Sequence, residues 1–300
     1  MMLKNFDDLI ALMNGNAEKK TVVVAGADDE HTLEGIHTTM KAGLIKAVLI
    51  GNKDKINMII KNKCFQIDSP IINAEDEQQT AEIAVSLIRE GKADFLMKGK
   101  LQTATLLKEV VNKETGINQG KVMSHVGLFE IPTYYKLIVI TDGGMILNPD
   151  LAQKKAILEN AVEALRCLGI VSPKVAVMAG AEVVNPKAPE SVEALKLMEL
   201  CETGEIKDCY VEGPISYDLA MSKEAAIIKG YDSIVAGDAD ILLMPSMTAG
   251  NMVGKSLTIS GNTKMAGIIM GAKVPIVLTS RSASSEEKYL SLMFAAAVTR

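Results

Sequence analysis

A serine and an arginine follow a buried, strand-like segment near the end of the chain. Residues 274–279 (VPIVLT) form a continuous apolar run, and Ser280 and Arg281 come directly after it, ahead of a helical pattern over 285–298. A hydroxyl, a guanidinium and the free N–H groups of a new helix would then lie together, and such groups bind anions. The residues alone leave a second interpretation open, in which this is a strand-to-helix loop without a ligand.

Two carboxylates open the helix predicted over 285–298. Ser284 and Glu287 fit the S-x-x-E capping box, in which the two side chains only close the first turn of the helix. Either Glu287 or its neighbour Glu286 could instead serve as an acid or base beside the Ser280–Arg281 pair.

Further polar residues follow other predicted strands. Lys98 and Lys100 come after the apolar run 93–97, and Asp142 comes after 136–141. In open parallel sheets, ligands bind outside the carboxyl ends of the strands. We therefore expect a binding site among these residues.

The segment 250–256 (GNMVGKS) resembles a nucleotide-binding P-loop without matching it. The P-loop needs a glycine five residues before Gly254, where Ala249 stands, and the sequence after Lys255 (SLTISGNT) is a poor helix former. No G-x-G-x-x-G follows a strand either. The sequence thus argues against ATP, GTP or nicotinamide binding.

The elements that must position these residues alternate between strands and helices. The apolar runs are continuous and rich in β-branched residues, which is typical of strands buried on both faces of a parallel sheet. Strands are predicted over 21–25, 46–50, 93–97, 136–141, 174–179, 239–244 and 274–279, and helices over 75–90, 149–168, 189–203 and 285–298. This alternation predicts an α/β fold.

Local signals set some boundaries. Asn148, Pro149 and Asp150 predict an N-cap, a proline at the first helical position and an early acid, and Gly169 predicts the end of that helix. Residues 212–214 (EGP) are interpreted as a polar turn.

Composition excludes several classes of protein. The net charge is −5 with no run of like charges, so a nucleic-acid footprint is missing. No stretch approaches the roughly 18 apolar residues of a membrane span, and residues 1–16 read as a short helix. The scattered cysteines predict reduced thiols in a cytoplasmic protein. The three histidines lack metal-ligand spacing, so no metal site is expected.

Several longer segments resemble one family. In order they are ADFLMKGKLQTATLLKEVVN, SHVGLFEIPTYYKLIVITDGGMILNPDL, AEVVNPKAPESVEALK, EGPISYDLAMSKEAAIIKG, VAGDADILLMPSMTAGNMVGKSL and VPIVLTSRSASSEEK. They are similar to the phosphate acetyltransferase and phosphate butyryltransferase family, and they cover the chain from about residue 93 to the end. TDGGMILNPDL and SHVGLFE look more like the butyryl branch.

The resemblance implies a fold. It is a two-domain α/β/α architecture like that of isocitrate and isopropylmalate dehydrogenases, with the active site in an interdomain cleft. We expect residues 1–123 plus 271–300 to form the first domain and residues 124–270 the second.

The resemblance also implies site residues. The family's Ser-Arg pair matches Ser280 and Arg281, and the acetyl branch has a catalytic Asp at the position of Glu287, seven residues after the serine. Butyryl-type sequences tend to have Glu one residue earlier, so we expect Glu286 to act and Glu287 to cap the helix, with the reverse kept open. The phosphate- and coenzyme A-binding candidates are Lys98, Lys100, Lys108, Ser124, His125, Asp142, Asn251 and Lys255.

The implied reaction moves a short acyl group, butyryl above others, between coenzyme A and inorganic phosphate. It needs no tightly bound cofactor, and the family expectation is a homo-oligomer. The alternatives are a phosphate acetyltransferase, a non-catalytic coenzyme A or anion binder, and a decarboxylating dehydrogenase of the same fold.

Overall fold

The chain folds into alternating strands and helices, as the apolar pattern predicts. The structure is a computed structural model that describes residues 2–14, 19–118, 120–280 and 283–299. The chain divides into two compact units. The N-terminal unit comprises Phe6–Lys121 and Ala266–Arg300, and the middle unit comprises Met1–Asn5 and Val122–Met265.

In the N-terminal unit, the strands follow the order β3-β2-β1-β4-β11-β10. Neighbouring strands pair in parallel from β3 to β11, whereas β10 and β11 are antiparallel. The strands are β1 (Lys20–Ala25), β2 (Ile45–Gly51), β3 (Ile71–Asn73), β4 (Phe95–Lys98), β10 (Lys264–Met270) and β11 (Ile276–Val277); the helices are α1 (Phe6–Asn14), α2 (Glu30–Lys41), α3 (Lys53–Lys63), α4 (Glu77–Arg89), α5 (Thr103–Val110) and α11 (Ser285–Val298).

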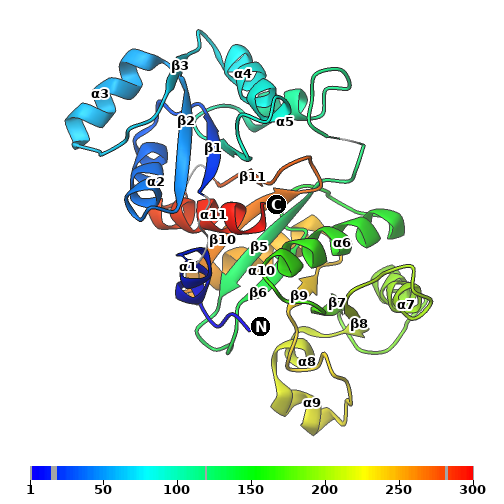
Figure 1. Cartoon of the computed structure of the whole chain (residues 1–300). Helices are drawn as coiled ribbons and strands as arrows, with labels where there is room; N and C mark the ends of the chain where they lie inside the picture. The colour runs from blue at the N-terminus through cyan, green and yellow to red at the C-terminus, as the bar shows by residue number, and fades with distance from the viewer. Residues whose placement is uncertain (1, 15–18, 119, 281–282, 300) are drawn as a thin grey trace. The chain divides into compact units, whose positions relative to one another are not determined.

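The core of this unit is the centre of its sheet. The apolar side chains of Val22, Val23 and Val24 in β1 and of Phe95 and Leu96 in β4 are fully buried. Helix α11 packs against α2 and α1, while α4 packs against α5 (Figure 1). Helices thus cover the sheet, and this explains why the sequences of its strands are continuous apolar runs.

In the middle unit, the strands follow the order β5-β6-β9-β7-β8, with β5 antiparallel to β6 and the other pairs parallel. Helix α6 packs against β5, β6 and β9, α10 against β6, and α7 against β7 and β8. The strands are β5 (Ser124–Glu130), β6 (Ile138–Thr141), β7 (Lys174–Met178), β8 (Tyr210–Ile215) and β9 (Ile241–Leu243); the helices are α6 (Leu151–Cys167), α7 (Pro189–Glu202), α8 (Tyr217–Met221), α9 (Lys223–Lys229) and α10 (Met247–Ser260).

Two local predictions in the middle unit were wrong. The N-cap of α6 is Asp150, whose carboxylate accepts the Gln153 N–H at 2.8 Å in a reciprocal capping box, so the helix starts after Asn148 and Pro149. Residues 212–214 lie in β8, where a proline is tolerated because β8 is last in the strand order. Helix α10 runs through Lys255, although the sequence there is a poor helix former.

The first residues of the chain group with the middle unit, not with the unit that follows them in sequence. The N–H of Leu137 donates to the carbonyl of Leu3 at 2.8 Å, and Leu3 is buried. This contact holds the first residues against the start of β6.

Among the helices of the described residues, none is both long and apolar enough to cross a membrane. Within the same residues, no group of three or more His, Cys, Asp or Glu side chains has a metal-binding arrangement.

Candidate active site

The Lys98–Gly99–Lys100 segment is held by the end of β1. The N–H of Gly99 donates to the carbonyl of Ala25 at 2.8 Å, and that of Lys100 donates to the carbonyl of Gly26 at 2.7 Å. A Cβ on Gly99 would stand 2.1 Å from the Gly26 oxygen, so only glycine fits there. The two backbones therefore place both lysines at the carboxyl ends of the strands.

The two lysines of this segment differ in exposure. The Lys98 side chain is buried, and its ammonium donates to the carbonyls of Gly99 at 3.1 Å and Leu101 at 3.2 Å. Lys100 is exposed.

Helix α11 begins close to the end of β11. Ser284 is its N-cap, and the Ser284 hydroxyl accepts the N–H of Glu287 at 3.1 Å. Ser280 is exposed in the connection between β11 and α11. Arg281, the predicted anion-binding arginine, lies outside the described residues.

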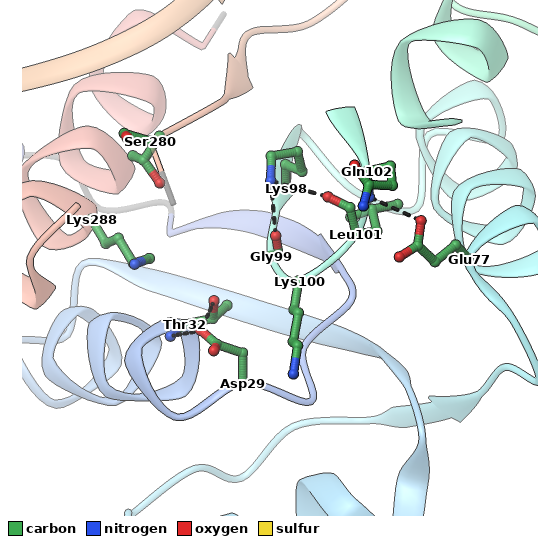
Figure 2. Close-up of a pocket in the computed structure, with 11 residues that line it drawn as sticks. Asp29, Thr32, Glu77, Lys98, Gly99, Lys100, Leu101, Gln102, Ser280 and Lys288 are labelled. Atoms are coloured by element: carbon green, nitrogen blue, oxygen red, sulfur yellow. Dashed lines mark hydrogen bonds between the residues drawn. The ribbon is translucent and has the colours of Figure 1, made fainter. Parts of the chain in front are cut away.

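These segments border one pocket of about 350 Å³ in the N-terminal unit (Figure 2). It lies where β1, β4 and β11 end and where α2 and α11 begin, the position at which open α/β sheets bind ligands. Its lining residues are Asp29, Thr32, Glu77, Lys98, Gly99, Lys100, Leu101, Gln102, Thr279, Ser280 and Lys288.

The two acids of the pocket are engaged with backbone groups. Asp29 caps α2, and its Oδ2 accepts the N–H and the hydroxyl of Thr32 at 2.9 and 2.8 Å. Burial by itself would raise the pKa of Asp29, but these bonds and the nearby ammonium of Lys288 lower it. Glu77 accepts the N–H of Gln102 at 2.9 Å. Both carboxylates hold the pocket wall in place.

The carboxylates that open α11 have different surroundings. Glu286 is exposed and Glu287 is half-buried. Burial raises the pKa of the Glu287 carboxyl, against a smaller opposing effect of the Lys288 charge. A raised pKa is what a carboxylate needs to accept a proton near neutral pH.

The remaining predicted residues do not line the pocket. Lys108 is exposed on α5. Five others belong to the middle unit: Ser124, His125, Asp142, Asn251 and Lys255.

Asp142 shapes the turn after β6. Its buried carboxylate accepts the backbone N–H groups of His125, Gly144, Met145 and Ile146 at 2.8 to 3.2 Å. A carboxylate so engaged organises the backbone of the turn.

The other middle-unit candidates surround this turn and β5. Burial lowers the pKa of His125, although the charge of Asp142 opposes this. The Nδ1 atom of His125 is buried and, within the described part of the chain, has no hydrogen-bond partner. The Ser124 hydroxyl accepts from the Asn160 amide at 2.9 Å, and the Asn251 amide donates to the Gly143 carbonyl at 3.2 Å. Lys255 is exposed on α10.

The P-loop-like segment has a packing explanation. Both of its glycines lie inside α10, where a Cβ on Gly250 would meet the Asp142 oxygen at 2.4 Å and one on Gly254 would meet the Phe129 ring at 3.3 Å. The helix is glycine-rich because it approaches β6 and β5 closely. It forms no phosphate-binding loop.

The structure thus brings together Lys98, Lys100 and Ser280 among the predicted residues. It adds residues that the sequence analysis missed, Lys288 above all. A signal for Lys288 existed: it shares a helical stripe with Ser291, Leu292 and Ala295, all of them buried. A lysine at a core-facing position of an apolar helix needs a partner.

A lysine-lined pocket at the carboxyl ends of parallel strands, in an α/β fold, has the position and the charge that suit an anionic ligand. Residues 72–297 match the family described as "Phosphate acetyl/butaryl transferase", and the chain belongs to that family.

Relatives of both branches are similar to the whole chain. The phosphate butyryltransferase of Clostridium acetobutylicum is 41% identical over 99% of each chain. The phosphate acetyltransferase of Thermotoga maritima is 37% identical over 97% of this chain and 98% of its own. The crystal structure of a branched-chain phosphotransacylase from Enterococcus faecalis V583 superposes with a TM-score of 0.82 at 36% identity, covering 94% of this chain and 99% of that one.

Proposed function

We propose that this protein transfers a short acyl group reversibly between coenzyme A and inorganic phosphate, with butyryl as the preferred group. The observation that carries this proposal is the pocket in which Lys98, Lys100 and Ser280 converge, in a chain of the phosphate acyltransferase family. The similarity to the Clostridium butyryltransferase supports butyryl. The similarity to the Thermotoga acetyltransferase keeps acetyl as the second candidate.

In the forward reaction, an oxygen of phosphate attacks the thioester carbonyl of acyl-CoA. The C–O bond of the acyl phosphate forms, the C–S bond breaks, and the coenzyme A sulfur leaves with the bonding electron pair. The proton that the attacking hydrogen phosphate gives up ends on that sulfur, so the products are acyl phosphate and the coenzyme A thiol. Lys98, Lys100 and Arg281 hold the phosphate, and the Ser280 hydroxyl donates a hydrogen bond to the carbonyl oxygen as it becomes negative. No covalent enzyme intermediate is required, because both reactants bind together.

In the reverse reaction, the coenzyme A thiol must lose its proton before it attacks the acyl phosphate. We assign that proton to Glu287, because burial raises the pKa of its carboxyl, whereas Glu286 is exposed. This choice departs from the expectation that Glu286 acts, and variants of both residues decide between them.

The same proposal includes a two-domain fold like that of isocitrate and isopropylmalate dehydrogenases, with an interdomain cleft. It also includes a cytoplasmic location, a homo-oligomeric state and the absence of a tightly bound cofactor. Six further residues are proposed to contribute to coenzyme A or phosphate binding: Ser124, His125, Asp142, Asn251, Lys255 and Lys108.

The direct test is product formation. Purified protein is incubated with butyryl-CoA and phosphate, and butyryl phosphate is trapped with hydroxylamine as the hydroxamate. The proposal predicts hydroxamate that depends on both substrates. Acetyl-CoA as a much better substrate would move the chain to the acetyl reaction. The absence of any hydroxamate with acyl-CoA substrates of two to five carbons would refute the transferase.

A further inference from the structure

Lys288 is a buried lysine with an incomplete set of hydrogen bonds. The residue is only 6% exposed, and its ammonium donates to the carbonyl of Ala283 at 3.0 Å. An ammonium carries three N–H donors, and within the described residues that carbonyl is the one acceptor bonded to it. Burying a charge without full compensation is costly, so a further acceptor is expected at this position.

The close approach of α2 to α11 fixes where Lys288 lies. Gly35 of α2 faces it, and a Cβ on Gly35 would stand 3.1 Å from the Lys288 Cβ. The Ser285 hydroxyl at the start of α11 donates to the carboxylate of Glu34 and fixes the same crossing. Because Gly35 has no side chain, the Lys288 chain can pass α2 and present its ammonium to the pocket.

Lys98 presents a second buried ammonium to the same pocket. Figure 2 shows Lys98 reaching it from the end of β4 and Lys288 from α11, with Ser280 nearby. The two carboxylates of the lining, Asp29 and Glu77, are held by the backbone and hydroxyl groups described above. Within the described residues, neither carboxylate forms an ion pair with Lys288.

We propose that Lys98 and Lys288 together bind one phosphate group in its dianionic form, with Gly35 as the residue that allows Lys288 to reach it. Two ammonium groups match the charge of such a dianion, and its oxygens can accept the N–H groups that Lys288 has left. This inference rests on the proposed function, since it names how that same site holds phosphate. The phosphate group is either inorganic phosphate or a phosphate of coenzyme A.

The experiment measures both ligand binding and turnover. Thermal stabilisation by inorganic phosphate, and separately by coenzyme A, is recorded at constant ionic strength for the wild type, Lys288→Met, Lys288→Arg and Gly35→Ala. Lys61→Met, which removes an exposed lysine of α3, is the matched control. Steady-state kinetics give the KM for phosphate and for acyl-CoA, with kcat.

The expected result is a rise of at least about tenfold in the phosphate KM and loss of stabilisation by phosphate in Lys288→Met, as expected when one charge-assisted contact is lost. Gly35→Ala should show a smaller loss, Lys288→Arg a partial recovery, and Lys61→Met no change. If only stabilisation by coenzyme A is lost, the pair holds a phosphate of coenzyme A. Unchanged binding of both ligands in a folded Lys288→Met or Gly35→Ala protein would overturn the proposal.

The same measurements distinguish failure of the anion site from failure of the proposed transferase function. A wild type that binds phosphate through Lys288 but turns over no acyl-CoA would keep the anion site and reject the transferase. If the wild type turns over acyl-CoA but Lys288→Met changes the binding of neither ligand, the transferase proposal stands and the anion site is rejected.

Discussion

Gly250 of α10 lies directly against the backbone carbonyl of Asp142 at the end of β6. A Cβ on Gly250 would stand 2.4 Å from that oxygen, and the next closest atom would be the Gly143 Cα at 3.0 Å. The turn beyond Asp142 is itself fixed by four backbone N–H groups that donate to the Asp142 carboxylate. The helix and the turn therefore form one rigid contact in the middle unit.

Replacing Gly250 with alanine should destabilise the protein. The new methyl group would meet the backbone oxygen of Asp142, and the Asp142 carboxylate holds that backbone in place, so it cannot move away easily. We therefore expect a loss of about 2–3 kcal/mol in the free energy of unfolding. Urea denaturation measures it. Gly180→Ala is the control, since a Cβ at Gly180 would meet nothing within 4 Å. Equal stability of the two variants would contradict the contact.

A buried lysine network at the start of β6 should also be essential for stability. The Lys136 ammonium donates to Asp238 at 2.7 Å and to Asp240 at 2.6 Å, with Lys136 and Asp240 nearly inaccessible. Lys136→Met leaves two carboxylates without this partner, and we expect a loss of about 3 kcal/mol. Lys155→Met, which breaks the surface pair with Glu159, should cost about 0.5 kcal/mol or less. Chemical denaturation compares the two.

The same network predicts an acid-dependent stability. Burial alone would raise the pKa of Asp238, but hydrogen bonds from Lys136, Lys174 and Tyr135 lower it from 3.8 to about 2. A carboxyl whose pKa is lower in the folded state stabilises above its unfolded pKa, and that stability is lost as the pH falls through the folded value. Asp238→Asn should therefore be less stable than the wild type above pH 3.8, and the difference should shrink as the pH falls toward 2. A difference independent of pH over that range would contradict the assignment.

The proton-accepting role should belong to Glu287. Glu287→Gln should reduce the rate of acyl-CoA formation from acyl phosphate by about 10²–10⁴-fold, the usual contribution of a general base. Because burial raises the Glu287 pKa, the wild-type rate should fall as the pH drops through that raised value. Glu224→Gln, at an exposed position of α9, is the control.

Glu286→Gln is the deciding comparison. If it causes the larger loss of kcat and abolishes the pH dependence, the base is Glu286 and Glu287 serves only the helix start. If both variants keep the wild-type rate, neither carboxylate accepts the thiol proton.

Buried strands were the easiest elements to predict. The apolar runs that become β1, β2 and β11 are continuous because both faces of the sheet are covered, and the bounds of α11 follow from Ser284 as its N-cap. Strand β5 was missed because His125 and Gly127 interrupt its apolar pattern. Elements such as β5 were not predicted because their formation depends on tertiary contacts that the local sequence does not reveal.

Helix α10 shows the limit of local propensity. Its second half contains Thr258 and Ile259, which disfavour a helix, yet it continues to Ser260 because Gly254 packs against the Phe129 ring. At the site, Lys98, Lys100 and Ser280 could be placed because they follow strands. The helical stripe marks Lys288 as a core-facing lysine that needs a partner, but its place in the pocket depends on the crossing of α2 and α11 at Gly35.

The most direct test of phosphate-dependent butyryl transfer is the release of free coenzyme A thiol from butyryl-CoA, with and without inorganic phosphate, in the wild type and in Arg281→Ala. We expect release that requires phosphate, exceeds the release from acetyl-CoA and is lost in the variant. Phosphate-independent release, or none from any short acyl-CoA, would contradict it.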